Sequence, residues 1–177
     1  MLVRMALGRY LIDLDSTQCA TIGMSPVERD DLAQDLCSRA LAIGRRYPIP
    51  GQLADALDGL CDVERSLGQN DSALAHARQA ITFREKLGDK GRLAGSYKDL
   101  GAAYRAMGRP NEAEQAYRAG LDLIAQAPHP ENAANLHQEL QLFYAAQGRF
   151  REAHSHLLES HRLRNNLMDE EKRQEVV

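Results

Sequence analysis

Apolar residues recur at three- and four-residue steps along most of the chain, the spacing that places them on one face of an α-helix. The pattern is clearest from Tyr97 to Leu121, where two apolar stripes are separated by a break. Gly108 suits the end of the first helix and Pro110 the first turn of the second. This segment therefore predicts a helical hairpin. Its two stripes are Tyr97, Leu100, Gly101, Tyr104 and Met107, then Ala113, Ala116, Tyr117, Gly120, Leu121 and Ile124.

The same hairpin returns at a constant interval, the repeat period, which is the spacing from Gly68 to Gly108 and again from Gly108 to Gly148. Four classes of position keep this register: a leucine in the first helix, a glycine after it, an alanine in the second helix, and a breaker between hairpins. A repeat of this kind buries each apolar stripe against neighbouring hairpins. The four classes are Leu60, Leu100 and Leu140; Gly68, Gly108 and Gly148; Ala73, Ala113 and Ala153; and Pro48, Gly88 and Pro128.

The periodicity predicts an all-α, right-handed solenoid of seven or eight helices. Besides the two helices above, it predicts helices over 1–15, from Ser25 to a break at 47–50, and over 52–67, 71–87, 132–147 and 151 onward. Ser25 and Glu28 have the spacing of a capping box, and Asn70 or Asp71 is expected to cap the helix that follows it. The expected units are a degenerate repeat or cap (1–50), three repeats (51–90, 91–130 and 131–165) and a helical extension (166–177). The turn between the first two full repeats is expected at 88–91.

The hairpin at 97–121 resembles the tetratricopeptide repeat, in the long-period variety of many bacterial signalling proteins. The residues that match are Tyr97, Leu100, Gly101, Tyr104, Gly108, Ala113, Tyr117 and Gly120. The flanking copies depart from the pattern at Cys61, Glu64, Gln141 and Leu157, and the resemblance covers roughly residues 52 to 165. The family is an architecture, so the resemblance implies a binding surface without naming what it binds.

Composition narrows the class of partner. The net charge of −3 disfavours nucleic acid or an anionic membrane as the main partner. Cys19, Cys37 and Cys61 lack metal-ligand spacing, which favours free thiols in a reducing compartment. No leader-like or membrane-spanning apolar run is found in the sequence, so a cytoplasmic protein is expected.

Neither a catalytic motif nor a nucleotide-binding loop is present in the sequence, so we expect no enzyme activity and no cofactor. The histidines are the nearest approach to a metal site: His154, His156 and His161 share one helix and His137 lies on the helix before it. Their spacing does not place them together on one face, so no metal is expected. They are interpreted as partly exposed residues of the groove and its rim.

The family resemblance implies that the first helix of each hairpin lines a concave groove that binds a protein or peptide. Family members that hold a terminal carboxylate use lysine and asparagine there, whereas this chain carries several acids, which suit a basic or polar segment better. An equally open interpretation of Asp55, Asp58 and Asp62 is an ordinary solvated stripe. The candidate groove residues are Asp55, Asp58, Asp62, Arg65, Lys98, Asp99, Ala102, Arg105, Asn135, Gln138, Glu139 and Leu142.

The last predicted helix lacks the breaker that the register places at Met168. It is either a polar capping helix or the start of a helical linker. The stretch from Asn165 resembles the junction between long-period tetratricopeptide sensors and GGDEF-type diguanylate cyclases. The leading hypothesis is a regulatory input module of a bacterial signalling protein. The alternatives are a stand-alone adaptor and a small-ligand-binding segment of a transcription regulator.

Overall fold

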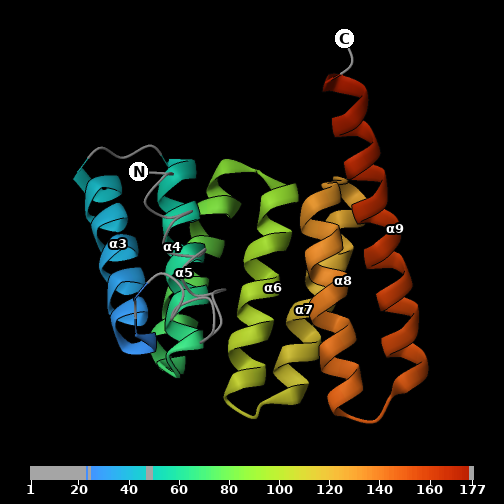
Figure 1. The fold of residues 1–177 in the computed structure, drawn as a ribbon, viewed down its shortest axis with the longest axis horizontal. Coiled ribbons are helices and arrows are strands. Elements are labelled where there is room, and N and C mark those ends of the chain that lie inside the picture. Colours follow the sequence, from blue (N-terminus) through green and yellow to red (C-terminus); the bar gives the residue numbers. More distant parts are fainter. Residues whose placement is uncertain (1–22, 24, 47–49, 176–177) are drawn as a thin grey trace. The chain divides into compact units, whose positions relative to one another are not determined.

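The computed structural model describes residues 23, 25–46 and 50–175. Within this part of the chain the secondary structure is seven α-helices, so the all-α expectation is confirmed (Figure 1). The helix predicted over 1–15 and Cys19 lie outside the described residues. The helices are α3 (Pro26–Arg46), α4 (Pro50–Ser66), α5 (Asn70–Leu87), α6 (Lys90–Ala106), α7 (Pro110–Gln126), α8 (Pro130–Ala146) and α9 (Phe150–Glu175).

The helices keep the repeat period of the sequence. α4, α6 and α8 begin at positions 50, 90 and 130, and α5, α7 and α9 begin at 70, 110 and 150. Each pair is joined by a short turn that contains a glycine with a left-handed backbone, for example φ +69° at Gly108. A side chain in that conformation would strain the backbone, which explains why glycine recurs at these turns.

The helix starts show which capping predictions were correct. The Ser25 amide donates to the Glu28 carboxylate at 2.8 Å, and the Glu28 amide donates to the Ser25 hydroxyl at 3.2 Å, so that capping box is confirmed. The cap expected from Asn70 or Asp71 is wrong, since Gln69 occupies the N-cap of α5 without a side-chain bond. Asn70 is already helical, and its side-chain amide donates to the Ala106 carbonyl.

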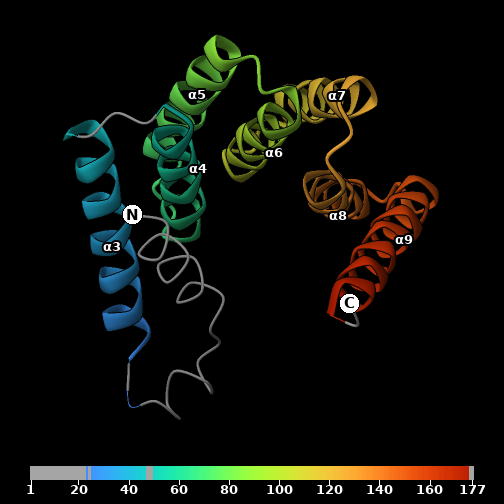
Figure 2. The ribbon, with the colours of Figure 1, turned by 90° about the horizontal axis from the view of Figure 1, so that it is seen from above.

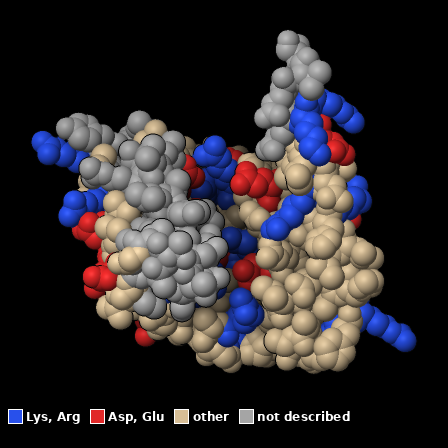
Figure 3. Space-filling model, in the orientation of Figure 1, with Lys and Arg blue, Asp and Glu red and all other residues tan. Residues whose placement is uncertain are grey.

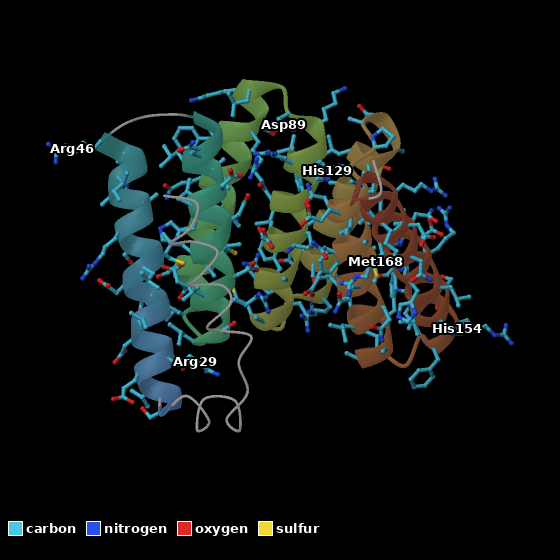
Figure 4. The ribbon with its side chains drawn as sticks, turned by 45° about the horizontal axis from the view of Figure 1, so that its top comes forward. Arg29, Arg46, Asp89, His129, His154 and Met168 are labelled. Atoms are coloured by element: carbon cyan, nitrogen blue, oxygen red, sulfur yellow. The ribbon has the colours of Figure 1, made fainter. Side chains whose placement is uncertain are left out.

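The inter-repeat turn predicted at 88–91 is shorter than expected. Gly88 is the left-handed C-cap of α5, and α6 begins at Lys90. The Asp89 carboxylate accepts a bond from the Arg92 amide at 3.1 Å and so caps α6 (Figure 4). His129, the N-cap of α8, accepts from the Asn132 amide through its ring, which starts α8 within the break predicted at 128–130 (Figure 4).

The chain divides into two compact units. The first contains α3, α4, α5 and residues 106–108, and the second contains α6 to α9 apart from those residues. In the first unit α4 packs against both α3 and α5. Its core is built from aliphatic side chains and one cysteine: Ala33, Cys37, Leu41, Leu53, Ala56, Leu57, Leu60, Val63 and Ala80.

The core of the second unit is built from close helix approaches filled by aromatic rings. The Gly101 backbone lies so near the fully buried Tyr117 ring that an added Cβ would be 2.5 Å from Tyr117 Cε1. Tyr117 meets Phe143 of α8 edge to face, with ring centroids 5.4 Å apart. α8 packs in turn against α9, as the view from above shows (Figure 2). Small and large residues at repeating positions therefore set how closely the helices pack.

The last helix runs past the end of the repeat, as predicted from the missing breaker. α9 has 26 residues, from Phe150 to Glu175, and continues through Met168, which is 53% exposed. Its second half presents mainly exposed polar residues. The extension is therefore a solvated helix rather than a part of the core.

Candidate functional site

Two of the acidic residues predicted to line the groove form ion pairs with an arginine of the first unit. The carboxylates of Asp55 and Asp58 on α4 contact the guanidinium of Arg84 on α5, at 2.8 Å and 2.5 Å. The Arg84 side chain is 4% exposed and the two carboxylates are 22% and 14% exposed. This bridge offsets the negative charge that the sequence pattern suggested for this part of α4.

Electrostatics favour the charged form of Arg84. Burial would lower the pKa of its guanidinium, but the attraction of Asp58 and Asp55 and their hydrogen bonds outweigh burial and leave the pKa raised. Further along α4, Asp62 and Arg65 lie near each other, with 3.5 Å between their charged atoms.

At the equivalent positions of the last hairpin, an arginine of the second helix again contacts two residues of the first helix. Arg164 of α9 stands two repeat periods after Arg84, and it donates to the side-chain oxygens of Asn135 and Gln138 on α8. Those two residues stand two periods after Asp55 and Asp58. The acceptors are neutral and this contact is exposed, so the repeat reuses one geometry with different chemistry.

In the second unit, α6 and α8 lie side by side. Arg105 of α6 and Glu139 of α8 form an ion pair at 2.9 Å, and the Asn132 side chain donates to the Gly91 carbonyl at 2.8 Å. Within α6, Lys98 contacts the adjacent Asp99 at 2.7 Å. The Arg105–Glu139 pair brings together predicted groove residues from the first helices of two successive hairpins.

The predicted groove positions of α8 include exposed side chains. Gln138 is exposed, and Leu142, the next predicted groove residue on this face of α8, is 43% exposed. In Figure 3 the surface over α8 and α9 is largely uncharged, with charged side chains of both signs at its margins. An exposed leucine beside polar groups can bind an apolar side chain of a partner and fix its orientation.

The histidines predicted as rim residues fall into two groups. His154 and His161 are exposed on α9, where His154 and Met168 mark the first and second halves of the helix in Figure 4. His137 and His156 contact each other through their Nδ1 atoms at 2.8 Å. Among the described residues, no group of three or more histidine, cysteine or acidic side chains is arranged to hold a metal ion.

The repeated hairpins and their glycine turns agree with a family model. A model of the tetratricopeptide repeat matches residues 52–126 and 92–166, which together span more than half of the chain. The chain belongs to the tetratricopeptide repeat family.

Similar proteins carry the same repeat fold. The chain is 29% identical to Protein KINESIN LIGHT CHAIN-RELATED 3 of Arabidopsis thaliana, over 76% of this chain and 22% of that protein. Among solved structures, BtubC (BKLC) from P. vanneervenii has a TM-score of 0.61 and 20% identity, over 78% of this chain and 58% of that one. A Rap protein complexed with Competence and Sporulation Factor has a TM-score of 0.67 and 14% identity, over 94% and 45%. The chain thus spans about a fifth of that plant relative and about half of those two structures.

The tetratricopeptide pattern also explains a contact that sequence reasoning missed. Tyr104 and Tyr144 match the pattern, whereas Glu64 stands at the equivalent position of the first full hairpin. Glu64 is 5% exposed and its carboxylate meets the His76 ring at 2.7 Å. His156 stands two repeat periods after His76 and stacks on Tyr144, with ring centroids 5.4 Å apart. The sequence does carry a signal for this contact, because Glu64 and His76 stand at the register positions of Tyr144 and His156.

The described helices of this tetratricopeptide repeat protein include none that is both long and apolar enough to cross a membrane.

Proposed function

We propose that this protein is a non-catalytic scaffold that binds a protein or peptide segment across the first helices of its hairpins, α6 and α8 above all. The observation that carries this proposal is the exposed Leu142, which lies beside Gln138 on a surface tied to α6 by the Arg105–Glu139 pair. The Rap structure supports the proposal, since that protein has a similar fold and is complexed with Competence and Sporulation Factor. In the second unit the proposed contact residues are Lys98, Asp99, Arg105, Asn135, Gln138, Glu139 and Leu142. In the first unit they are Asp55, Asp58, Asp62 and Arg65.

The chemistry of these residues favours a polar segment with at least one apolar side chain as the partner. Asp55 and Asp58 are engaged by Arg84, so they attract a basic partner less than free acids would. Arg105 and Glu139 offer both signs of charge at 33% and 18% exposure. A segment that carries one apolar anchor and hydrogen-bonding groups around it matches this surface.

Binding to an array of immobilised peptides tests the proposal. Leu142→Arg is expected to weaken binding at least about tenfold, because it removes the apolar contact and adds charge. Leu158→Arg on α9 is the matched control, since Leu158 is also exposed, at 57%, but lies outside the proposed surface. Thermal unfolding of both variants should match the parent protein. Equal loss of binding in both variants, or no loss in Leu142→Arg, would contradict the proposed surface.

The long last helix supports a role in signalling. We infer that the chain is the regulatory input module of a long-period bacterial signalling protein, such as a GGDEF-type diguanylate cyclase, with α9 continuing toward the output domain. Its unbroken course through Met168 is the observation behind this inference. The native reading frame after the codon for Val177 tests it: a following catalytic domain is expected, and a stop codon there would instead favour a stand-alone adaptor.

A further inference from the structure

We propose that His137 and His156 form a proton-sensitive contact that loosens the last hairpin, α8 and α9, in mildly acidic solution. Their Nδ1 atoms lie 2.8 Å apart and their ring centroids 5.0 Å apart. One ring comes from α8 and the other from α9, so the contact joins the two helices of the hairpin. Both side chains are half-buried. A change in this contact therefore acts directly on how the two helices pack.

The number of protons on the pair decides whether the contact survives. A bond between two imidazole nitrogens needs one N–H donor and one bare nitrogen as acceptor. In the neutral pair, one ring carries its proton on Nδ1 and the other on Nε2. One added proton on the free Nε2 of the donor ring leaves this bond in place. A second added proton must go to the acceptor Nδ1, and two N–H groups then face each other.

The surroundings oppose protonation of the pair. Burial is the main cause that lowers the pKa of both rings, and for His137 the neighbouring His156 lowers it further. Glu159 acts in the other direction on His137, but Arg162 bonds to Glu159 and itself lowers the pKa of His137. Glu152 favours the charged form of His156, and its carboxylate is held by Arg149 at 2.7 Å.

The contact extends to a third helix through Tyr144. The His156 ring stacks on Tyr144 of α8 with an angle of 16° between the planes. The Tyr144 hydroxyl donates to Glu114 of α7 at 3.2 Å, and the Arg149 guanidinium lies 4.2 Å from the centre of the Tyr144 ring. When the imidazoles separate, the stack on Tyr144 loses its support, and the packing around Glu114 is disturbed with it.

The sign of the pH effect follows from the lowered pKa values. Well above the ordinary histidine pKa of about 6.5, both rings are neutral in the folded and the unfolded chain. As the pH falls below that value, the unfolded chain takes up protons first, so stability is lost until the pH passes the folded-state pKa.

The first full hairpin supplies an internal reference. His76 stands at the register position of His156 but meets the Glu64 carboxylate at 2.7 Å. An imidazolium at His76 faces a negative charge rather than a second imidazole. We therefore expect acid to loosen α8 and α9 while it leaves the His76 contact between α4 and α5 in place.

Amide hydrogen exchange of the full chain at pH 7.5 and pH 5.5, corrected for intrinsic exchange rates, tests the proposal. In the parent protein, peptides from α8 and α9 should exchange at least about fivefold faster at pH 5.5, and those from α4 and α5 should change less than about twofold. His137→Asn should reduce the response of α8 and α9 below about twofold, because an amide can accept from a protonated His156 or donate to a neutral one. His154→Asn, an exposed histidine of the same helix as His156, is the matched control and should respond like the parent.

Two results would overturn the proposal: an unchanged acid response in His137→Asn, or no response of α8 and α9 in the parent protein. If His137→Asn fails to fold, an NMR titration of the parent imidazoles replaces it. Both His137 and His156 should then titrate below the ordinary histidine pKa, and titration of either one at or above that value would contradict the proposal.

Discussion

Arg84 joins the two helices of the first full hairpin by ion pairs with Asp55 and Asp58, in addition to their apolar packing. Removing its side chain would take the guanidinium away from the carboxylates of both Asp55 and Asp58. Because those carboxylates retain some contact with water, we expect Arg84→Ala to lower the free energy of unfolding by about 2–3 kcal/mol. Urea denaturation measures this loss.

The control for Arg84 lies two repeat periods further along the chain. Arg164→Ala removes the register-equivalent arginine, whose neutral acceptors Asn135 and Gln138 can bond to water instead. Its effect should stay within about 0.5 kcal/mol. Equal losses from the two substitutions would contradict the expectation that burial and charge make the Arg84 bridge the stronger of the two.

Glu64 and His76 show how a departure from the family pattern is accommodated by a second residue. Glu64→Ala should cost about 2 kcal/mol, because it leaves the half-buried His76 ring without its partner. Glu64→Tyr should cost at least about 1 kcal/mol less, because His76 could then stack on the new ring as His156 stacks on Tyr144. Thermal unfolding at constant pH compares the two variants. If the tyrosine variant is no more stable than the alanine variant, the two hairpins do not share this geometry.

At the scale of helices, packing depends on where a backbone can approach a ring. Gly101→Ala places a methyl group against Tyr117, and this ring is fully buried and cannot move aside freely. We expect a loss of about 1–3 kcal/mol in unfolding free energy, measured by urea denaturation. Gly51→Ala is the control, since no atom lies within 4 Å of its added Cβ. It should be neutral or stabilise α4 by up to about 1 kcal/mol, and a similar loss in both would rule out the close approach as the cause.

The second half of α9 has few apolar side chains that could be buried. Deleting residues 169–177 should change the free energy of unfolding by less than about 0.5 kcal/mol, since the described side chains of that segment are exposed. Circular dichroism should show only the loss of the deleted turns, and thermal unfolding should keep its midpoint. A large drop in that midpoint would mean that the segment packs against a partner or another copy in solution.

For the whole molecule, the elements could be predicted from the sequence much better than the contacts between side chains. Period, helix order and turns follow from local signals such as Gly108 and Pro110, which act through their own backbone preferences. The start of α5 differs from the prediction by one residue, and Asn70 uses its side chain for the Ala106 carbonyl rather than to cap its own helix.

Partners across helices could not be predicted in the same way. Asp55 and Asp58 have the spacing of a solvated stripe, and nothing near them in the sequence indicates Arg84, which joins them from the next helix. His137 and His156 were interpreted as separate rim residues because a count along one helix does not show which neighbouring helix each ring faces. The repeat register relates equivalent positions of different hairpins, as it relates Arg84 to Arg164, but it does not name the residue that each one contacts. The groove assignment itself stays a prediction.

The polar contacts of the first full hairpin have a consequence for how such a gene can change. The contact of Glu64 with His76 and the contact of Arg84 with Asp55 and Asp58 each lie within one stretch of the chain, the hairpin of α4 and α5. An unequal crossover that duplicates or deletes that stretch carries both members of each pair together. Neither of these two contacts therefore loses one member while the other stays buried. The length of this protein can thus vary by whole hairpins more readily than its individual charged residues can be exchanged.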